Sequence, residues 1–282
     1  MAATLSILIP AYNYLLGIEN ILTKLEPLNH PEIEIIVFDD SNNSAICQHV
    51  NHINKNRELN LTYHRNIPAL GAVFNWNSLL KAATGEFLLL LHHDEFPLTT
   101  EFVSRTIQCL KSITTDYDVL VMQCILTTIN GKINRPHLPF LFRKFIVSNF
   151  PTYIFKRNVI GPTSCLIVRK SIYPKFDTEL KWLVDVETYY RLRLKTSRWY
   201  YSKELEMGST VGRMDSITYN MKDQLCEVYT SEKKYLSKKY CMARNWLDPE
   251  LHPLLNFTEE LFWIAFRMLT IAFYKFMSLF KI

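Results

Sequence analysis

Residues 88–95 have the sequence Leu88-Leu89-Leu90-Leu91-His92-His93-Asp94-Glu95, and this stretch decides the fold. A continuous apolar run of this length is typical of a strand buried on both faces, as in a parallel sheet. The imidazoles and carboxylates that follow would be costly inside an apolar core, so they mark the carboxyl end of the strand. Ligands of open α/β sheets bind outside the carboxyl ends of strands. The stretch therefore predicts a site for a metal ion or a phosphorylated ligand around Asp94.

Strand and helix patterns alternate through the first 91 residues. Apolar runs predict strands at 4–10, 34–38, 61–64 and 86–91, and apolar residues at three- and four-residue spacing predict helices between them. This alternation is the pattern of an α/β domain with a mostly parallel sheet. Polar residues end three of these strands, at Tyr12-Asn13, Asp39-Asp40 and His93-Asp94. Because the carboxyl ends of parallel strands share one edge, we expect these residues to line one crevice.

The rest of the chain continues with both kinds of element. Helices are expected at 97–112, 182–194 and 216–241, and strands at 118–122, 165–168 and 199–202. Asn130-Gly131 predicts a hairpin within 125–133. Residues 135–158 are rich in aromatic and basic side chains, and such a segment can contact a substrate, a membrane surface or another chain.

The last segment, 257–282, has a pattern of its own. Phenylalanine and leucine recur at heptad-like spacing, and the polar residues fall on a narrow stripe. A helix this apolar must bury most of its circumference. It is expected either to lie in the headgroup region of a membrane or to pack on the domain or on a second copy in a homo-oligomer.

The composition limits the class of protein. With 282 residues, of which 48% are hydrophobic and 21% charged, the chain fits one large domain with an appendage, or two domains. A net charge of +5 gives no indication of a nucleic-acid partner. The six cysteines form neither a CxxC pair nor a zinc-ligand spacing, which favours reduced, mostly buried thiols. Without a signal-peptide pattern or a charge-free window of spanning length, we expect a cytoplasmic protein, peripheral to any membrane.

Five motifs, each at a predicted strand end, carry a family resemblance. They are Ile9-Pro10-Ala11-Tyr12-Asn13, Val37-Phe38-Asp39-Asp40-Ser41, Arg65-Asn66 with Gly71 and Asn75, Gly85-Glu86-Phe87, and His92-His93-Asp94-Glu95. In this order they resemble the family 2 inverting glycosyltransferases of the GT-A fold. The resemblance is detailed over 4–100 and looser to about residue 218. It implies a GT-A catalytic domain at 1–215, with a donor-binding half at about 1–100 and an acceptor half at about 101–215, and a helical C-terminal extension at 216–282.

The resemblance also implies a nucleotide-diphospho-sugar donor. Asp40 matches the residue that accepts a hydrogen bond from a uracil imide, and a carboxylate is indeed an acceptor-only group. This favours UDP, although a thymidine donor offers the same imide. Asp39 either shares that role or caps the following turn, and Arg213 either contacts the diphosphate or forms a surface ion pair. The implied donor-binding residues are Pro10, Ala11, Tyr12, Asn13, Asp39, Asp40, Gly71, Asn75, His92, His93 and Arg213.

The metal motif of the family, usually written DXD, corresponds here to His92-His93-Asp94. The resemblance implies that Asp94 binds Mn²⁺ or Mg²⁺, with His92 as a further candidate ligand. These ions commonly take only one or two ligands from protein, and the rest come from phosphates and water. Mn²⁺ tolerates an imidazole better than Mg²⁺.

Asp185 matches the catalytic base of the family. Inversion by direct displacement needs a carboxylate that takes the proton of the attacking hydroxyl. The alternative for Asp185 is a cap or first-turn acid of its helix, and Glu187 is the second candidate base. The implied acceptor- or sugar-binding residues are Glu95, Gly161, Pro162, Thr163 and Glu187.

Together these features imply transfer to a hydroxyl of a glycan or lipid-linked glycan in bacterial surface polysaccharide assembly. Because one metal carboxylate is missing, a catalytically inactive nucleotide-sugar or glycan-binding module on the same fold is the alternative. A nucleotidyltransferase is a third interpretation, but it would bring a glycine-rich phosphate loop near the first strand, where only Gly17 is present.

Overall fold

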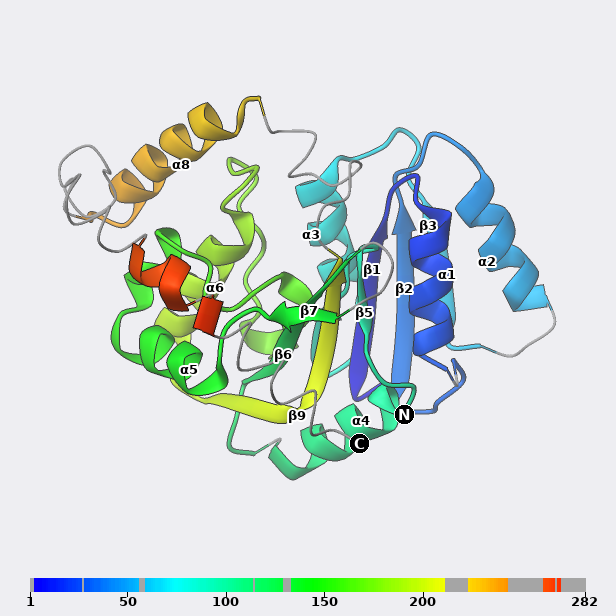
Figure 1. The fold of residues 1–282 in the computed structure, drawn as a ribbon. Helices are drawn as coiled ribbons and strands as arrows, with labels where there is room; N and C mark the ends of the chain where they lie inside the picture. The colour runs from blue at the N-terminus through cyan, green and yellow to red at the C-terminus, as the bar shows by residue number, and fades with distance from the viewer. Residues whose placement is uncertain are drawn as a thin grey trace.

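The computed structural model describes residues 3–26, 28–55, 59–113, 115–128, 133–210, 223–242, 261–266 and 268–269. One sheet with the strand order β3-β2-β1-β4-β8-β6-β9-β5 runs through this part of the chain, and β7 pairs with β6 (Figure 1). The strands are β1 (Leu5–Ala11), β2 (Ile33–Asp39), β3 (Leu61–Arg65), β4 (Phe87–Leu90), β5 (Glu95–Pro97), β6 (Val119–Thr127), β7 (Ile133–Pro136), β8 (Leu166–Arg169) and β9 (Trp199–Thr210).

The expected α/β architecture is confirmed. Strands β1 to β4 are mutually parallel, with registers such as Leu5 opposite both Ile33 and Phe87. Beyond β4, strands β6 and β9 keep that direction, whereas β5, β7 and β8 run against it. Six of the nine described strands therefore share one direction, and the carboxyl ends of β1, β2 and β4 meet at one edge.

Helices cover both faces of this sheet. Apolar side chains of α1, α2 and α4 form one core with the sheet, and those of α3, α5, α6 and α8 form the other (Figure 1). Leu88 and Leu90 enter one core while Leu89 enters the other, as expected for a strand buried on both faces. The helices are α1 (Leu15–Lys24), α2 (Ala45–Lys55), α3 (Ala72–Ala82), α4 (Phe102–Ile113), α5 (Phe140–Asn149), α6 (Val184–Lys195) and α8 (Leu225–Lys239), with 3₁₀ turns at Pro151–Phe155, Thr163–Cys165 and Lys170–Ile172.

Three sequence expectations differ from the structure in extent. The helix expected at 97–112 begins only at Phe102, because Glu95–Pro97 form β5 against Met207–Ser209 of β9. Strands β6 and β9 are longer than expected since they pair with each other along most of their length. The hairpin of β6 and β7 is present, but its turn at 129–132 lies outside the described residues.

The C-terminal extension is described only in part. Helix α8 replaces the longer helix expected at 216–241, and the residues before 223 lie outside the described ranges. Of 257–282, residues 261–266 and 268–269 are described, as helix. Trp263 is buried there and donates a hydrogen bond of 2.7 Å to the Tyr153 hydroxyl. Among the described helices, none combines the length and the apolar character needed to cross a membrane.

Candidate active site

The carboxylate of Asp40 joins three segments at the edge of the sheet. It is buried at the end of β2 and accepts hydrogen bonds from the Asn66 side chain (2.7 Å) and from the backbone N–H groups of Leu70 (3.1 Å) and Gly71 (2.8 Å). A carboxylate offers about four acceptor positions, and these bonds use three. Asp40 therefore connects the end of β2 to the end of β3 and to the start of α3.

Asp39 caps the turn that follows β2. One carboxylate oxygen accepts the Ser41 N–H (2.8 Å) and the other accepts the Tyr63 hydroxyl (2.7 Å), and the residue is fully buried. The hydroxyl of Ser41 in turn accepts the Asn13 N–H at 2.7 Å, which ties the end of β1 to this turn. Of the two roles expected for Asp39, the geometry is that of the turn cap.

The other residues expected at the donor edge differ in exposure. Asn75 is buried, and it donates to the Phe38 carbonyl (3.0 Å) and accepts from the Asn66 amide (3.3 Å). It thereby helps to hold the Asn66 side chain that binds Asp40. Ala11 is also buried at the end of β1, whereas the ring of Tyr12 is 55% exposed. Tyr12 therefore presents the aromatic surface at this edge.

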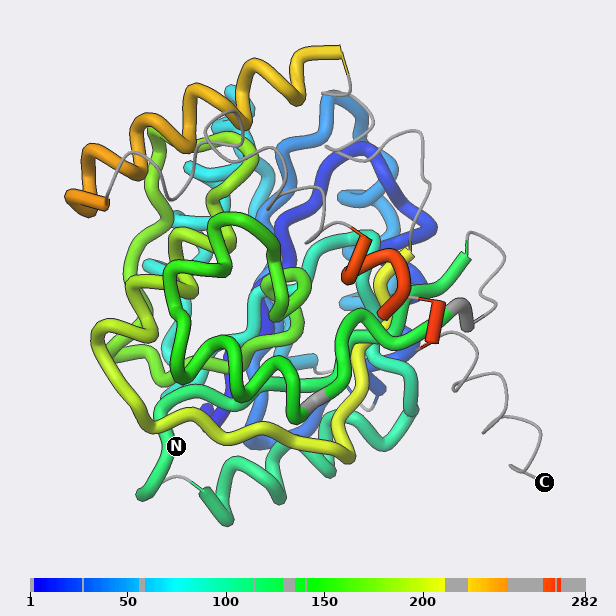
Figure 2. Tube along the Cα trace, turned by 60° about the vertical axis from the view of Figure 1, so that its left-hand side comes forward, coloured from blue at the N-terminus to red at the C-terminus, as the bar shows by residue number. Residues whose placement is uncertain are grey.

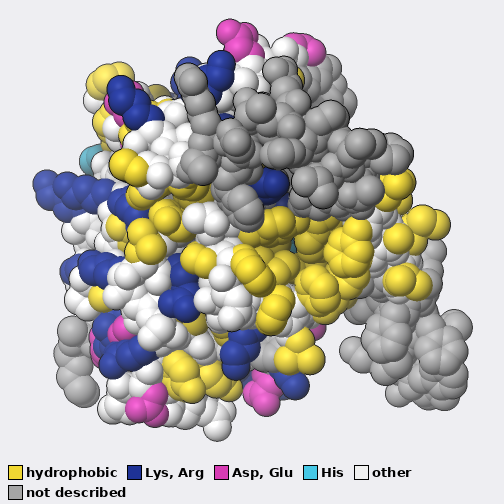
Figure 3. All heavy atoms as spheres, turned by 90° about the vertical axis from the view of Figure 1, so that its left-hand side faces the viewer, with side chains coloured by type: hydrophobic (Ala, Val, Ile, Leu, Met, Phe, Trp, Pro, Cys, Tyr) yellow, Lys and Arg dark blue, Asp and Glu magenta, His cyan; other side chains and the backbone are white. Residues whose placement is uncertain are grey.

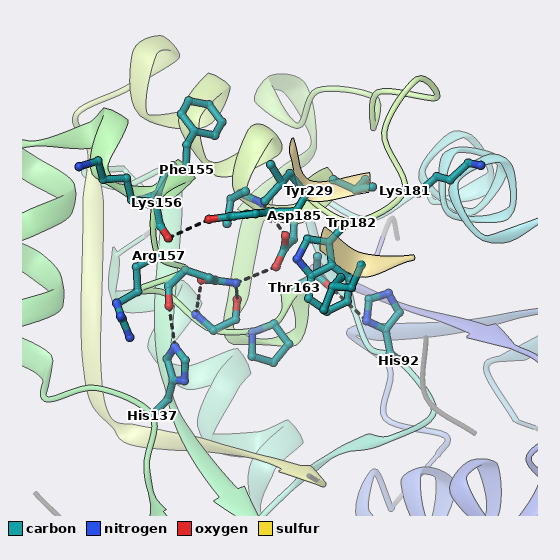
Figure 4. Close-up of a pocket in the computed structure, with 18 of the residues that line it drawn as sticks. His92, His137, Phe155, Lys156, Arg157, Thr163, Lys181, Trp182, Asp185 and Tyr229 are labelled. Carbon is teal, nitrogen blue, oxygen red and sulfur yellow. Dashed lines mark hydrogen bonds between the residues drawn. The ribbon is translucent and has the colours of Figure 1, made fainter. Parts of the chain in front are cut away.

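His92 lies where the donor edge meets the acceptor half. Its Nδ1 is 3.3 Å from the Thr163 hydroxyl (Figure 4). The same atom is 3.5 Å from a carboxylate oxygen of Glu95, and the His92 ring packs on Trp76 with centroids 4.7 Å apart. Burial lowers the pKa of His92, but the charges of Glu95, Asp94 and Asp185 outweigh it and raise the pKa above its ordinary value. Glu95 is buried, and its carboxylate also accepts the backbone N–H of His92 at 3.3 Å.

Asp94 and His92 are the candidate metal ligands at the end of β4. The described residues contain no cluster of three metal-ligating side chains. They give the half-buried Asp94 carboxylate no hydrogen-bond donor, and the buried Nε2 of His92 has no hydrogen-bond partner among them. One carboxylate and one imidazole fit a divalent cation that takes its other ligands from a diphosphate and water. His93 instead turns its ring toward Tyr14, with centroids 5.7 Å apart.

A pocket of about 840 Å³ opens beside His92 and contains Asp185 on its wall (Figure 4). The loop Gly161-Pro162-Thr163 lines it as well, so the structure brings these predicted residues together with the predicted base. Trp182, which was not predicted, is a further lining residue. Gly161 has φ +109°, a conformation that favours glycine, and a Cβ there would lie 3.3 Å from the Cys165 sulfur. The backbone conformation and the close packing on Cys124 of β6 and on Cys165 therefore favour a glycine here.

Two hydrogen bonds hold the Asp185 carboxylate. Oδ2 accepts the side-chain N–H of Asn158 at 2.7 Å, and Oδ1 accepts the Val186 N–H at 2.7 Å. Burial raises the pKa of Asp185 to about 6, although the Val186 N–H and the charge of His92 oppose this rise. The group is therefore mostly ionised at neutral pH and has a higher proton affinity than an exposed aspartate.

Asn158 is a site residue that the sequence did not reveal. Besides binding Asp185, its amide donates to the Gly161 carbonyl (2.9 Å), and its Oδ1 accepts the Gly161 N–H (2.9 Å). Its own carbonyl lies 2.9 Å from His137 Nε2, at the pocket wall (Figure 4). The only available signal was its position three residues before Gly161-Pro162, in a segment notable for aromatic and basic residues.

Glu187 is not among the residues that line the pocket. Glu187 is fully buried, and its carboxylate binds Arg191 (2.6 Å), Lys239 (2.6 Å) and the Tyr240 hydroxyl (2.5 Å). Two residues along a helix point in different directions, so Glu187 contacts α8 while Asp185 faces the pocket. Its expected roles as second base and acceptor contact do not fit this position. Arg213 lies outside the described residues.

Known structures share the fold of this chain, whereas comparison with curated protein sequences finds no significant match. S. aureus TarS 1–349 in complex with UDP-GlcNAc is 20% identical, with a TM-score of 0.60 over 76% of this chain and 60% of that chain. PcManGT, a mannosyltransferase from Pyrobaculum calidifontis in complex with GDP-Man and Mn²⁺, is 14% identical, with a TM-score of 0.56 over 82% of this chain and 64% of that one. This chain spans 45% to 65% of the lengths of such structures. The expected GT-A fold is thereby confirmed.

The sequence itself gives the family. The profile described as Glycosyl transferase family 2 matches residues 6–176, which is well over half of the chain. The matched range contains the donor edge, the strand end at His92-His93-Asp94 and the pocket loop at Gly161. The chain therefore belongs to glycosyl transferase family 2.

Proposed function

We propose that this protein transfers a sugar, with inversion, from a nucleotide-diphospho-sugar to a hydroxyl of a glycan or lipid-linked glycan acceptor. The observation that carries the proposal is the Asp185 carboxylate, which lies on a pocket wall and is oriented by Asn158. The UDP-GlcNAc and GDP-Man in the similar structures support a nucleotide-sugar donor.

Asp185 acts as the general base in this proposal. With a pKa of about 6, its carboxylate is available at neutral pH to take the proton of the acceptor hydroxyl. That hydroxyl attacks the anomeric carbon from the side opposite the leaving diphosphate, so the configuration inverts. The transition state carries oxocarbenium character, as in glycoside hydrolysis.

The donor would lie along the edge formed by β1, β2 and β4. The exposed Tyr12 ring offers a surface for the base, and the fourth acceptor position of Asp40 suits the imide N–H of uracil, or equally of thymine. Asp94, with His92 as a further candidate, would hold Mn²⁺ or Mg²⁺. When bound, such an ion offsets the negative charge that builds on the leaving diphosphate.

We also propose peripheral contact with the cytoplasmic face of a membrane. Hydrophobic side chains gather over one face of the molecule, with Lys and Arg beside them (Figure 3). On α5 and the described C-terminal turns, exposed apolar residues combine with the exposed Lys144, a composition that suits an anionic lipid surface. A lipid-linked acceptor of bacterial surface polysaccharide assembly would be reached from this face. The exposed apolar residues are Leu141, Phe142, Phe145, Phe150, Leu261, Phe262, Ile264, Met268 and Leu269.

A transfer assay tests the catalytic proposal. Wild-type protein is incubated with nucleotide sugars, Mn²⁺ and a set of lipid-linked and free glycan acceptors, and the anomeric configuration of any product is read by NMR. The proposal expects an inverted product that is lost in Asp185→Asn. Donor binding without any transfer would instead favour a catalytically inactive nucleotide-sugar-binding module on this fold.

A further inference from the structure

Helix α8 holds the loop before Asp185 through one buried carboxylate. Glu232 is only 5% exposed, and it accepts hydrogen bonds from three consecutive backbone N–H groups. These belong to Lys181 (2.5 Å), Trp182 (3.1 Å) and Leu183 (2.8 Å). Two views of the molecule agree in placing α8 alongside the segment that leads into α6 (Figures 1 and 2).

These three N–H groups lie in the loop that leads into α6, and the last of them belongs to Leu183, the N-cap residue, which provides no side-chain cap of its own. The positive dipole end of α6 favours a carboxylate at this position. Glu232 supplies that carboxylate from 49 positions further along the chain. Asp185 accepts one first-turn N–H of α6, that of Val186, through Oδ1, while its Oδ2 binds Asn158 at the pocket wall.

A second contact joins α8 directly to α6. At the other end of α8, Lys239 and Tyr240 bind the Glu187 carboxylate of α6. In the first turns of α8, before both contacts, Leu225, Cys226 and Tyr229 form part of the pocket wall. One helix thus supplies a wall of the pocket and also binds the loop that precedes Asp185.

We propose that Glu232 is a positioning residue for glycosyl transfer, which sets the location of Trp182 and Asp185 by holding the backbone of 181–183. This inference rests on the proposed role of Asp185 as general base. A displacement of about 1 Å in a reacting group can cost 10²-fold in rate. Loss of the Glu232 carboxylate should therefore lower the rate of transfer without changing donor affinity.

The test compares Glu232→Gln with a matched control, Glu34→Gln. Glu34 also accepts two consecutive backbone N–H groups, those of Thr84 (2.5 Å) and Gly85 (3.0 Å), but these precede β4 and lie far in sequence from Asp185. A glutamine keeps the shape of either side chain and places an N–H donor against backbone donors. Both variants are measured for hydrogen exchange, melting temperature, donor affinity, kcat and acceptor KM.

The two variants are expected to differ in hydrogen exchange at 181–183 and in kcat. In Glu232→Gln, exchange of the amides of 181–183 rises by about tenfold or more because charge-assisted hydrogen bonds are lost, kcat falls by about tenfold or more, and donor affinity is unchanged. Glu34→Gln is expected to lower the melting temperature similarly and to leave kcat unchanged. Glu232→Asp, which keeps the charge on a shorter side chain, should give intermediate exchange and kcat, and it serves if Glu232→Gln does not fold.

Two results would overturn the inference. One is unchanged exchange at 181–183 in both Glu232 variants, and the other is a loss of kcat that Glu34→Gln reproduces in proportion to its loss of stability. Failure of the proposed function is recognised separately, because wild-type protein would then show no transfer at all, while the hydrogen-exchange comparison would still report whether Glu232 holds the loop.

Discussion

Asn158 donates a 2.7 Å hydrogen bond to the Asp185 carboxylate, and the two residues are 27 positions apart in sequence. The same amide also binds the Gly161 carbonyl. This one side chain therefore fixes the position of the predicted base relative to the loop at Gly161. We therefore regard Asn158 as the residue that orients Asp185 for proton transfer.

Replacing Asn158 tests this orientation. In Asn158→Ala, kcat is expected to fall by about 10- to 100-fold because the base is no longer held in line with the acceptor hydroxyl, whereas donor affinity should not change. Steady-state kinetics with a thermal-shift measurement of donor binding would separate these effects. Asn149→Ala, an exposed asparagine at the end of α5, is the control and should behave as wild type. A fall in donor affinity equal to the fall in kcat would argue against a role confined to Asp185.

The pH dependence of transfer should report Asp185. Because burial raises its pKa to about 6, the ionised base forms as the pH increases through that value, and kcat should rise with it to a plateau near neutral pH. Asp185→Asn removes the base, so kcat is expected to fall by about 10²- to 10⁴-fold. A wild-type profile that is flat between pH 5 and 7 would contradict this assignment of the base.

The ionisation of Asp185 that favours transfer should lower the stability of the folded protein. The folded-state pKa of Asp185 is raised above its ordinary value of 3.8, so protonation favours the folded state and this contribution is lost as the pH rises through about 6. Asp185→Asn should therefore be more stable than wild type at pH 8, by about 1–2 kcal/mol after allowance for partial solvent access. The gain should vanish near pH 4, as measured by urea unfolding at both pH values. An equal effect at the two pH values would indicate that ionisation of Asp185 is not the cause.

The apolar face is expected to bind anionic lipid. Phe145→Ser on α5 should reduce co-sedimentation with vesicles of phosphatidylethanolamine and phosphatidylglycerol, since about 25 cal/mol is lost for each Å² of apolar surface no longer buried. Leu16→Ser is the control, because Leu16 is also well exposed but lies on α1, which covers the opposite face of the sheet. Unchanged vesicle binding with a change from dimer to monomer would assign the face to self-association instead.

The sequence predicted the sheet and the shared edge of its first strand ends well because both depend on local patterns. The run Leu88–Leu91 requires burial on both faces, and the polar residues from His92 to Glu95 mark its carboxyl end. Strand β5 was missed because three residues that include a proline form a strand only by pairing with Met207–Ser209, a contact that no local pattern indicates.

Other site residues depend on tertiary contacts in the same way. Asp185 and Glu187 are two residues apart and look alike in sequence, and only the position of α8 separates the pocket residue from the one that binds Lys239. Asn158 and Glu232 were missed for the related reason that each acts on atoms distant in sequence. Patterns of hydrophobicity carry no information about such side-chain partners.

Donor binding is the measurement that tests the central claim most directly. Wild-type protein and its Asp94→Ala and Asp185→Asn variants would be melted with a panel of uridine, thymidine and guanosine diphospho-sugars, with and without Mn²⁺. Ligand at 100 times its Kd stabilises a protein by about 2.7 kcal/mol, so a true donor gives a clear shift. We predict a shift with a uridine or thymidine donor that Mn²⁺ enlarges, that Asp94→Ala loses and that Asp185→Asn keeps. The absence of a shift with every nucleotide sugar, with or without Mn²⁺, would contradict the account.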